Sequence, residues 1–219
     1  YDPACLIPAL ILLDQALDLV GAVHDSHLAL NDFRATRYPL TVEGMEEATR
    51  DRWGNPFLHL MRRWLPDIVA CRPALVALSI NSFSQILAGL TLARLVKQAL
   101  PEVHLTLGGN FFGRVADRLQ RRPDFFQLFC DSLVVGEGEV ALEQLALNLR
   151  EGRAPEEVAR VVTAHGRGPL KPERVTQLEE IGPLDLADLP LDRYFSPEPV
   201  VCIQASRGCY WGQWSFCES

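Results

Sequence analysis

Short, mostly apolar runs alternate with amphipathic segments between residues 75 and 150. The runs predict strands at 75–80, 103–107 and 132–135, and the segments predict helices at 85–100, 112–119 and 140–150. Strands joined by helices over short connections form parallel sheets with right-handed crossovers. We therefore expect the three strands to be neighbours in the interior of one sheet. The predicted fold class is α/β, a Rossmann-like (flavodoxin-like) parallel sheet flanked by helices.

The flanking regions have weaker patterns. We predict helices at 6–19, 27–37 and from Asn55-Pro56 to about 64, and strands at 20–25 and 200–205. Residues 151–198 are richer in Gly, Pro and charge, which is typical of a connector that runs over a surface. The expected organisation is one domain at 1–150, a connector at 151–198, and the start of a second domain at 199–219.

Composition excludes some classes of function. The 219 residues carry a net charge of −7, which offers no electrostatic footprint for nucleic acid or an anionic membrane. No apolar run is expected to approach the length that spans a bilayer, and Tyr1-Asp2-Pro3 lacks the positive start of a signal peptide. Cys5, Cys71 and Cys130 lie in apolar surroundings and are interpreted as reduced core residues. We expect a cytoplasmic protein.

Small and polar residues follow each of the three predicted strands. Ligands of open parallel sheets bind beyond the carboxyl ends of the strands, and small residues there let a flat ligand approach the backbone. The candidate ligand-binding residues are Ser79, Ser82, Ser84, Gly108, Gly109, Asn110, Gly136, Glu137 and Gly138. The alternative for any single loop is a glycine turn that only ends the strand. A larger side chain, as in Gly109→Leu, is expected to block a ligand.

These segments resemble the cobalamin-binding domain that precedes many radical S-adenosylmethionine (SAM) enzymes. The matching pieces are Pro66-Asp67-Ile68-Val69, Leu78-Ser79 with Gln85, Leu107-Gly108-Gly109, and Val134-Val135-Gly136-Glu137-Gly138-Glu139. The resemblance implies bound cobalamin. The D-x-H-x-x-G signature of a histidine-ligated cobalt is incomplete, because Asp25 and His27 have its spacing but its glycine is absent. We interpret His27 as a surface or capping residue.

The segment Ser206-Arg207-Gly208-Cys209-Tyr210-Trp211-Gly212 resembles the lead-in to the iron–sulfur loop of radical SAM enzymes. That family binds a 4Fe–4S cluster through three cysteines and leaves one iron for SAM. The resemblance implies Cys209 and Cys217 as cluster ligands, with Trp214 in place of the middle cysteine. Tryptophan has no lone pair to offer iron. The alternative is two incidental cysteines.

The resemblance identifies the chain as the front half of a radical SAM enzyme, a methyltransferase or an enzyme of related radical chemistry. Cobalamin, a 4Fe–4S cluster and SAM are the implied cofactors of the intact enzyme. A small-molecule or peptide substrate is the implied partner, with no nucleic acid and no membrane. The chain as given is expected to be catalytically silent. Two alternatives stay open, a Rossmann-like module for another nucleotide-type ligand and a ligand-free regulatory or interaction domain. The absence of G-x-G-x-x-G after an early strand argues against NAD.

Overall fold

A computed structural model describes residues 2–169, 185–194, 198 and 200–201. The chain divides into two compact units, Asp2–Lys171 and a second made of Tyr1 with Pro172–Ser219. In the second unit, the described residues include a short 3₁₀ helix, η4 (Leu191–Arg193), closed by a hydrogen bond from the Arg193 amide to the Pro190 carbonyl. All other elements described below belong to the first unit.

The central sheet has the order β3-β4-β5-β6. Its strands are β3 (Leu75–Ser79), β4 (His104–Gly108), β5 (Ser132–Val134) and β6 (Val161–Thr163). The first three are parallel neighbours, and β6 is antiparallel to β5. The predicted α/β, Rossmann-like class and the parallel arrangement are confirmed. β3 differs from the expectation of an interior strand, because among the described strands of this sheet it pairs only with β4.

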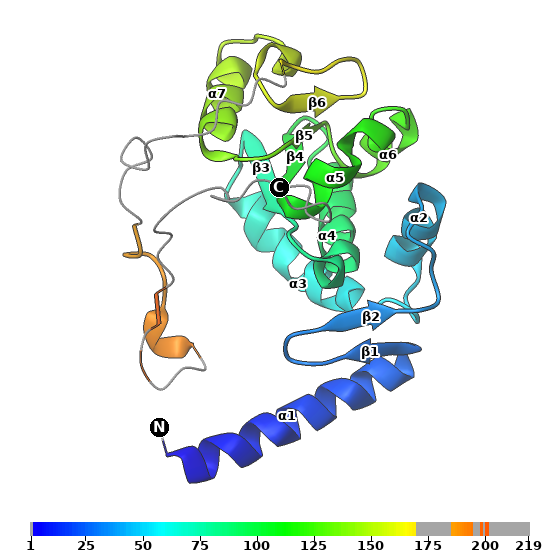
Figure 1. Ribbon diagram of the computed structural model, residues 1–219, viewed down its shortest axis with the longest axis vertical. Coiled ribbons are helices and arrows are strands. Elements are labelled where there is room, and N and C mark those ends of the chain that lie inside the picture. Colours follow the sequence, from blue (N-terminus) through cyan, green and yellow to red (C-terminus); the bar gives the residue numbers. More distant parts are fainter. Residues whose placement is uncertain (1, 170–184, 195–197, 199, 202–219) are drawn as a thin grey trace, which may run out of the picture. The chain divides into compact units, whose positions relative to one another are not determined.

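Helices cover both faces of this sheet (Figure 1). They are α3 (Phe57–Ala70), α4 (Ile86–Ala99), α5 (Asn110–Leu119), α6 (Pro123–Phe129) and α7 (Glu139–Arg150), and α2 (Val42–Arg50) packs on α4 and α6. Leu105, Leu107 and Leu133 point to the same face of the sheet, where they join the main core with α4, α5 and α6. Val134 points to the opposite face, where it packs with Leu145 of α7 in a smaller core. Strands in sequential order with right-handed crossovers place their connecting helices on one face, which explains the main core.

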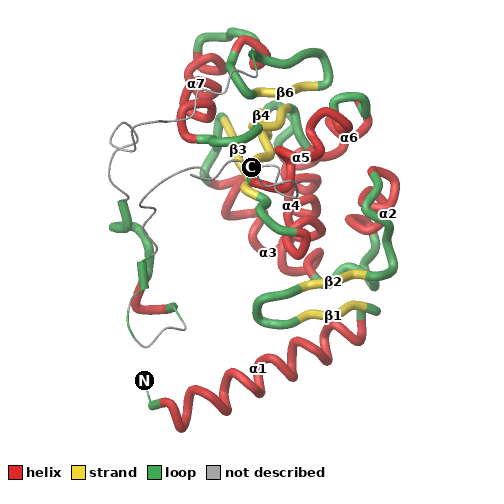
Figure 2. The backbone as a smooth tube through the Cα atoms, in the orientation of Figure 1, coloured by secondary structure: helices red, strands yellow, loops and turns green. Residues whose placement is uncertain are grey.

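The N-terminal region differs from the sequence-based prediction. The helix α1 (Pro3–Val23) begins at its N-cap Asp2 and continues through residues 20–23, which had been predicted as a strand. The predicted helix at 27–37 is instead an antiparallel hairpin of β1 (Ser26–Leu28) and β2 (Phe33–Ala35) (Figure 2). Phe33 explains the hairpin, because its side chain is buried in the main core while its neighbour Arg34 is exposed.

The outer surface of α1 is apolar and exposed, and Leu19 is 71% exposed. Within the described part of the chain, α1 is the one helix long and apolar enough to cross a membrane. The expectation that no apolar run reaches such a length was wrong. Signal sequences and core helices share this length and composition, so α1 does not assign a location.

Two further findings bear on the sequence-based predictions. The 3₁₀ helix η2 (Pro155–Glu157) and β6 lie within the range assigned to the connector, and β6 completes the sheet beside β5. Cys130 is buried as expected, whereas Cys5 and Cys71 are exposed and do not belong to the core.

Candidate functional site

The first candidate loop follows β3 and is fixed by Gln85. The Gln85 side-chain oxygen accepts hydrogen bonds from the amides of Asn81 at 2.8 Å and Ser82 at 3.3 Å. Ser82 is the N-cap of the 3₁₀ helix η1 (Phe83–Gln85), and the pair forms a capping box. The hydroxyl oxygens of Ser82 and Ser84 lie 2.8 Å apart. The polar groups of this loop therefore have defined positions at the end of β3.

The second loop follows β4 and lies against the first. Gly109 has a φ of 99°, and a Cβ atom there would lie 2.4 Å from the carbonyl oxygen of Ile80. The amide of Asn110 donates to the side-chain oxygen of Asn81 at 3.1 Å. Gly109 is thus required by the contact between the two loops, and Asn110 connects them.

The third loop follows β5 and begins at the exposed Gly136, whose φ is 81°. Gly138 follows with an ordinary φ of −96° and is the N-cap of α7. Neither α5 nor α7 has a side-chain hydrogen bond at its N-cap. The first two amides of α5 are already bonded, Asn110 to the Asn81 side chain and Phe111 to the Ile80 carbonyl. The positive end of the helix dipole makes both helix starts favourable for anionic groups. Glu139 occupies the first turn of α7, where an acid suits the positive end of the helix.

The sheet order brings the three loops together, because each follows one of three adjacent parallel strands. Ser79 at the end of β3 is directly opposite Gly108 at the end of β4. The structure thus gathers all nine predicted residues at one edge of the sheet.

Three further residues contribute to this edge. Asn81 and Phe83 lie within the predicted segment 79–84, and Phe111 was not predicted from the sequence. Phe83 is 67% exposed and makes an edge-to-face contact with the ring of Phe111 at a centroid distance of 5.3 Å. The sequence does signal Phe83, because it is an aromatic residue between Ser82 and Ser84. It adds an apolar contact surface to the edge.

The remaining predicted residues lie elsewhere. Cys209 and Cys217, together with Trp214, fall outside the described residues. Among the described residues, no group of three or more His, Cys, Asp or Glu side chains could hold a metal ion. His27 lies on β1, and its Nδ1 is 3.6 Å from the Asp18 carboxylate.

Comparison with known proteins gives one informative match. The chain is 30% identical, over 210 residues, to the hopanoid C-3 methylase of Methylococcus capsulatus (strain ATCC 33009 / NCIMB 11132 / Bath). The match covers 91% of this chain but only 39% of the methylase. No protein-family model and no solved structure matches the chain. The similarity gives limited support to a common family for the two proteins.

Proposed function

We propose that the unit Asp2–Lys171 binds cobalamin at the three loops, as the front part of a radical SAM methylase. The observation that carries the proposal is the convergence of three exposed, small-residue loops on adjacent parallel strand ends. This is the edge at which open α/β sheets bind flat and phosphate-bearing ligands.

The residues at this edge fit a flat macrocycle with amide and phosphate groups. A Cβ atom at Gly108 or Gly138 would have no neighbour closer than 3.6 Å, so both positions leave room for a ligand. Ser82, Ser84 and Asn110 would hydrogen-bond its polar substituents. Phe83 would contact its apolar surface. When bound, cobalamin would supply a transferable methyl group, and the chain's own residues would hold and orient it.

The assignment of methylation draws on the motifs of the chain and on the name of its relative. The motifs from Pro66 to Cys217 resemble those of cobalamin-dependent radical SAM enzymes, and the relative is named as a methylase that acts on a hopanoid. The resemblance implies radical chemistry that can include methylation of an unreactive carbon, and the name of the relative favours methylation. The chain spans 39% of the length of the relative. A small-molecule or peptide substrate of the intact enzyme and a cytoplasmic location are therefore parts of the proposal.

A titration of the 219-residue chain with hydroxocobalamin, followed by visible absorbance, tests cobalamin binding directly. The informative variant is Gly138→Leu, since this position has an ordinary φ and its Cβ would lie 3.9 Å from the nearest atom, Val134 Cγ1. We expect saturable binding by the parent chain and a loss of about tenfold or more in affinity for the variant, about 1.4 kcal/mol.

The matched control is Gln98→Leu, which adds the same side chain at an exposed position near the end of α4. Thermal unfolding of both variants checks that they fold. Absence of saturable binding by the parent chain, or equal affinity of parent and Gly138→Leu, would contradict the proposal. Saturable binding of a nucleotide without any binding of cobalamin would favour the alternative ligand class.

A further inference from the structure

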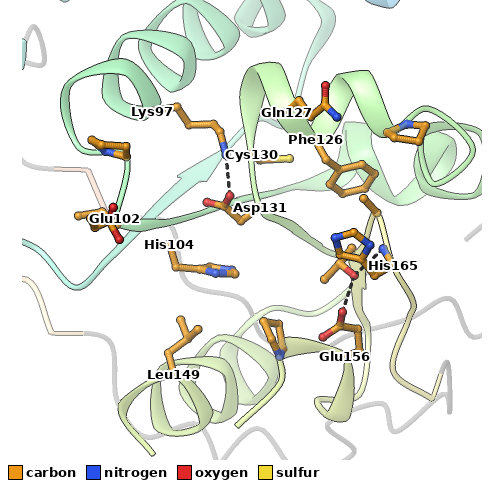
Figure 3. Close-up of a pocket in the computed structure, with 16 residues that line it drawn as sticks. Lys97, Glu102, His104, Phe126, Gln127, Cys130, Asp131, Leu149, Glu156 and His165 are labelled. Carbon is orange, nitrogen blue, oxygen red and sulfur yellow. Dashed lines mark hydrogen bonds and ion pairs between the residues drawn. The ribbon is translucent and has the colours of Figure 1, made fainter. Parts of the chain in front are cut away.

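A cavity of about 640 Å³ opens at the edge of the sheet opposite to the three loops (Figure 3). Its lining includes Glu102 just before β4, His104 at the start of β4 and Asp131 just before β5. Parallel strands begin at one edge of a sheet and end at the other, so this cavity is separate from the proposed cobalamin site. Its volume lies within the range of roughly 300–1,000 Å³ that is usual for small-molecule sites.

Hydrogen bonds assign the tautomer of His104. The Thr106 hydroxyl donates to the Ser132 carbonyl at 3.3 Å, and the Ser132 hydroxyl donates to the Thr106 oxygen at 2.9 Å. The Ser132 hydroxyl proton is already donated to Thr106, so the Ser132 oxygen can only accept a hydrogen bond from His104. The Nε2–H group of His104 is the donor, at 2.8 Å. Burial lowers the pKa of His104, so the ring is neutral at pH 7. Nδ1 therefore carries a free lone pair.

This lone pair belongs to a ring that projects into the cavity, between Asp131 and Leu149 (Figure 3). The Glu156 carboxylate lies on another wall, where it accepts the Thr163 hydroxyl at 2.9 Å. The walls thus present hydrogen-bond acceptors from two elements, β4 and η2.

The charges that line the cavity are mostly negative. Lys97 pairs with Asp131 at 2.6 Å, and the same carboxylate accepts the Leu105 amide at 2.7 Å. The cation is therefore neutralised within the wall. Glu102 and Glu156 are not matched by another lining lysine or arginine. A ligand with a positive charge is favoured over an anion.

Apart from a second imidazole, His165, the remaining lining is apolar or uncharged. Phe126 and Leu149 contribute hydrophobic surface. Burial raises the pKa of Cys130 well above its usual value, so its thiol stays protonated and is a poor metal ligand. No cluster of three candidate metal ligands occurs in the described part of the chain. These walls suit an organic group rather than a metal ion.

We propose that this cavity binds a small organic ammonium ion with an apolar body. The apolar body packs against Phe126 and Leu149. The ammonium group donates hydrogen bonds to His104 Nδ1 and to the Glu156 carboxylate. The proposal is independent of cobalamin binding, because none of these residues belongs to the three loops.

The test is an NMR titration of the 219-residue chain with 2-phenylethylamine, which is protonated at pH 7. The matched neutral probe is 2-phenylethanol, which has the same ring and chain length. We expect saturable amide shifts around His104, Asp131 and Thr163 for the amine and much weaker shifts for the alcohol. The side-chain nitrogen spectrum of His104 should show a protonated Nε2 and an Nδ1 resonance that moves when the amine binds.

Two neighbouring glutamates provide matched variants. Glu156→Gln removes a charge from the cavity wall, whereas Glu157→Gln makes the same change at an exposed position outside the lining. We expect Glu156→Gln to weaken binding of the amine by about tenfold, since charge-assisted hydrogen bonds are the stronger kind, and Glu157→Gln to leave it unchanged. The proposal is overturned by a lack of saturable shifts, by equal binding of amine and alcohol, by equal effects of the two variants, or by a protonated Nδ1 in free His104.

Discussion

The backbone of Gly109 passes so close to the carbonyl oxygen of Ile80 that a Cβ atom at position 109 would lie 2.4 Å from it. This contact joins the end of β4 to the end of β3. Gly109 also has a φ of 99°, in the region that side-chain-bearing residues rarely adopt. The glycine is therefore required twice, by space and by backbone conformation.

Replacement of Gly109 by alanine should lower the free energy of unfolding by on the order of 2 kcal/mol or more, because the strained φ and the clash with Ile80 both have to be relieved. The matched control is Gly108→Ala, whose Cβ would lie 3.6 Å from its nearest neighbour, an ordinary contact. Urea unfolding followed by circular dichroism measures both variants. Equal stability of the two would contradict the role of the Ile80 contact.

The same geometry changes how cobalamin binding should be tested. From the sequence, Gly109→Leu was the expected means of blocking the ligand. The contact with Ile80 means that this variant would disturb the loop whether or not a ligand binds there. A side chain at position 138 would meet no close neighbour in the protein. A variant there can therefore block a ligand without disturbing the loop.

Tyr38 and Asp51 should make stability depend on pH in the acidic range. The Tyr38 hydroxyl donates to the Asp51 carboxylate, and this bond is the largest cause that lowers the pKa of Asp51 to about 2. A carboxyl whose pKa is lower in the folded state stabilises the fold fully above its unfolded pKa of 3.8. That contribution is lost as the pH falls toward about 2.

Tyr38→Phe removes the donor, so the difference in unfolding free energy between parent and variant should be on the order of 1 kcal/mol at neutral pH and shrink below about pH 3. Chemical denaturation across this range measures the difference. In the Tyr38→Phe background, a further Asp51→Asn change should have a weaker pH dependence than the same change in the parent. A parent–variant difference that grows on acidification would refute the assignment.

His27 should not ligate cobalt. It is exposed on β1 beside Asp18, and the sequence around it lacks the glycine of the base-off signature. His27→Ala is expected to leave the cobalamin affinity and absorbance spectrum unchanged, whereas Phe83→Ala should weaken binding through loss of an exposed contact surface. Loss of a nitrogen-ligated cobalt signal in His27→Ala would show that the expectation is wrong.

The sequence predicted the part of the fold in which local pattern and tertiary packing agree. The strands β3, β4 and β5 and the helix α4 have apolar residues at the period of the element they form. The hairpin β1–β2 could not be recognised in this way, because its short strands depend on long-range burial of Phe33 in the main core. β6 was missed for a similar reason, since three residues that pair with β5 carry little periodicity of their own.

The candidate loops were predictable because a general rule places ligands at the carboxyl ends of parallel strands. The amine cavity was not, because it depends on tertiary contacts. His104 is one polar residue of a strand until its bond to Ser132 orients the ring. Likewise, the position of Glu156 at the cavity follows from the pairing of β6 with β5, which the sequence did not reveal.

Cysteine reactivity should follow the described burial. In a chain in which Cys202, Cys209 and Cys217 are changed to serine, the exposed Cys5 and Cys71 should react promptly with a thiol reagent under native conditions. Cys130 is buried and its thiol pKa is raised, so it should react only after unfolding. The stoichiometry before and after addition of denaturant measures this. Three rapidly reacting thiols in the native protein would contradict the burial of Cys130.

Iron retention should depend on the residue at position 214. Cys209 and Cys217 provide two thiolates, whereas a cluster that leaves one iron open to SAM needs three, and the indole of Trp214 cannot replace the third. The 219-residue chain should therefore retain little iron after anaerobic reconstitution with iron and sulfide and a desalting step.

Trp214→Cys should increase the iron and sulfide retained, since it supplies a third thiolate. Trp211→Cys is the control, because it adds a thiol at another position. The parent is not expected to produce 5′-deoxyadenosine from SAM after reduction, because its cluster would lack the third thiolate. A stable cluster with 5′-deoxyadenosine formation in the parent chain, or equal iron retention by the two cysteine variants, would contradict the assignment of position 214 as the missing ligand.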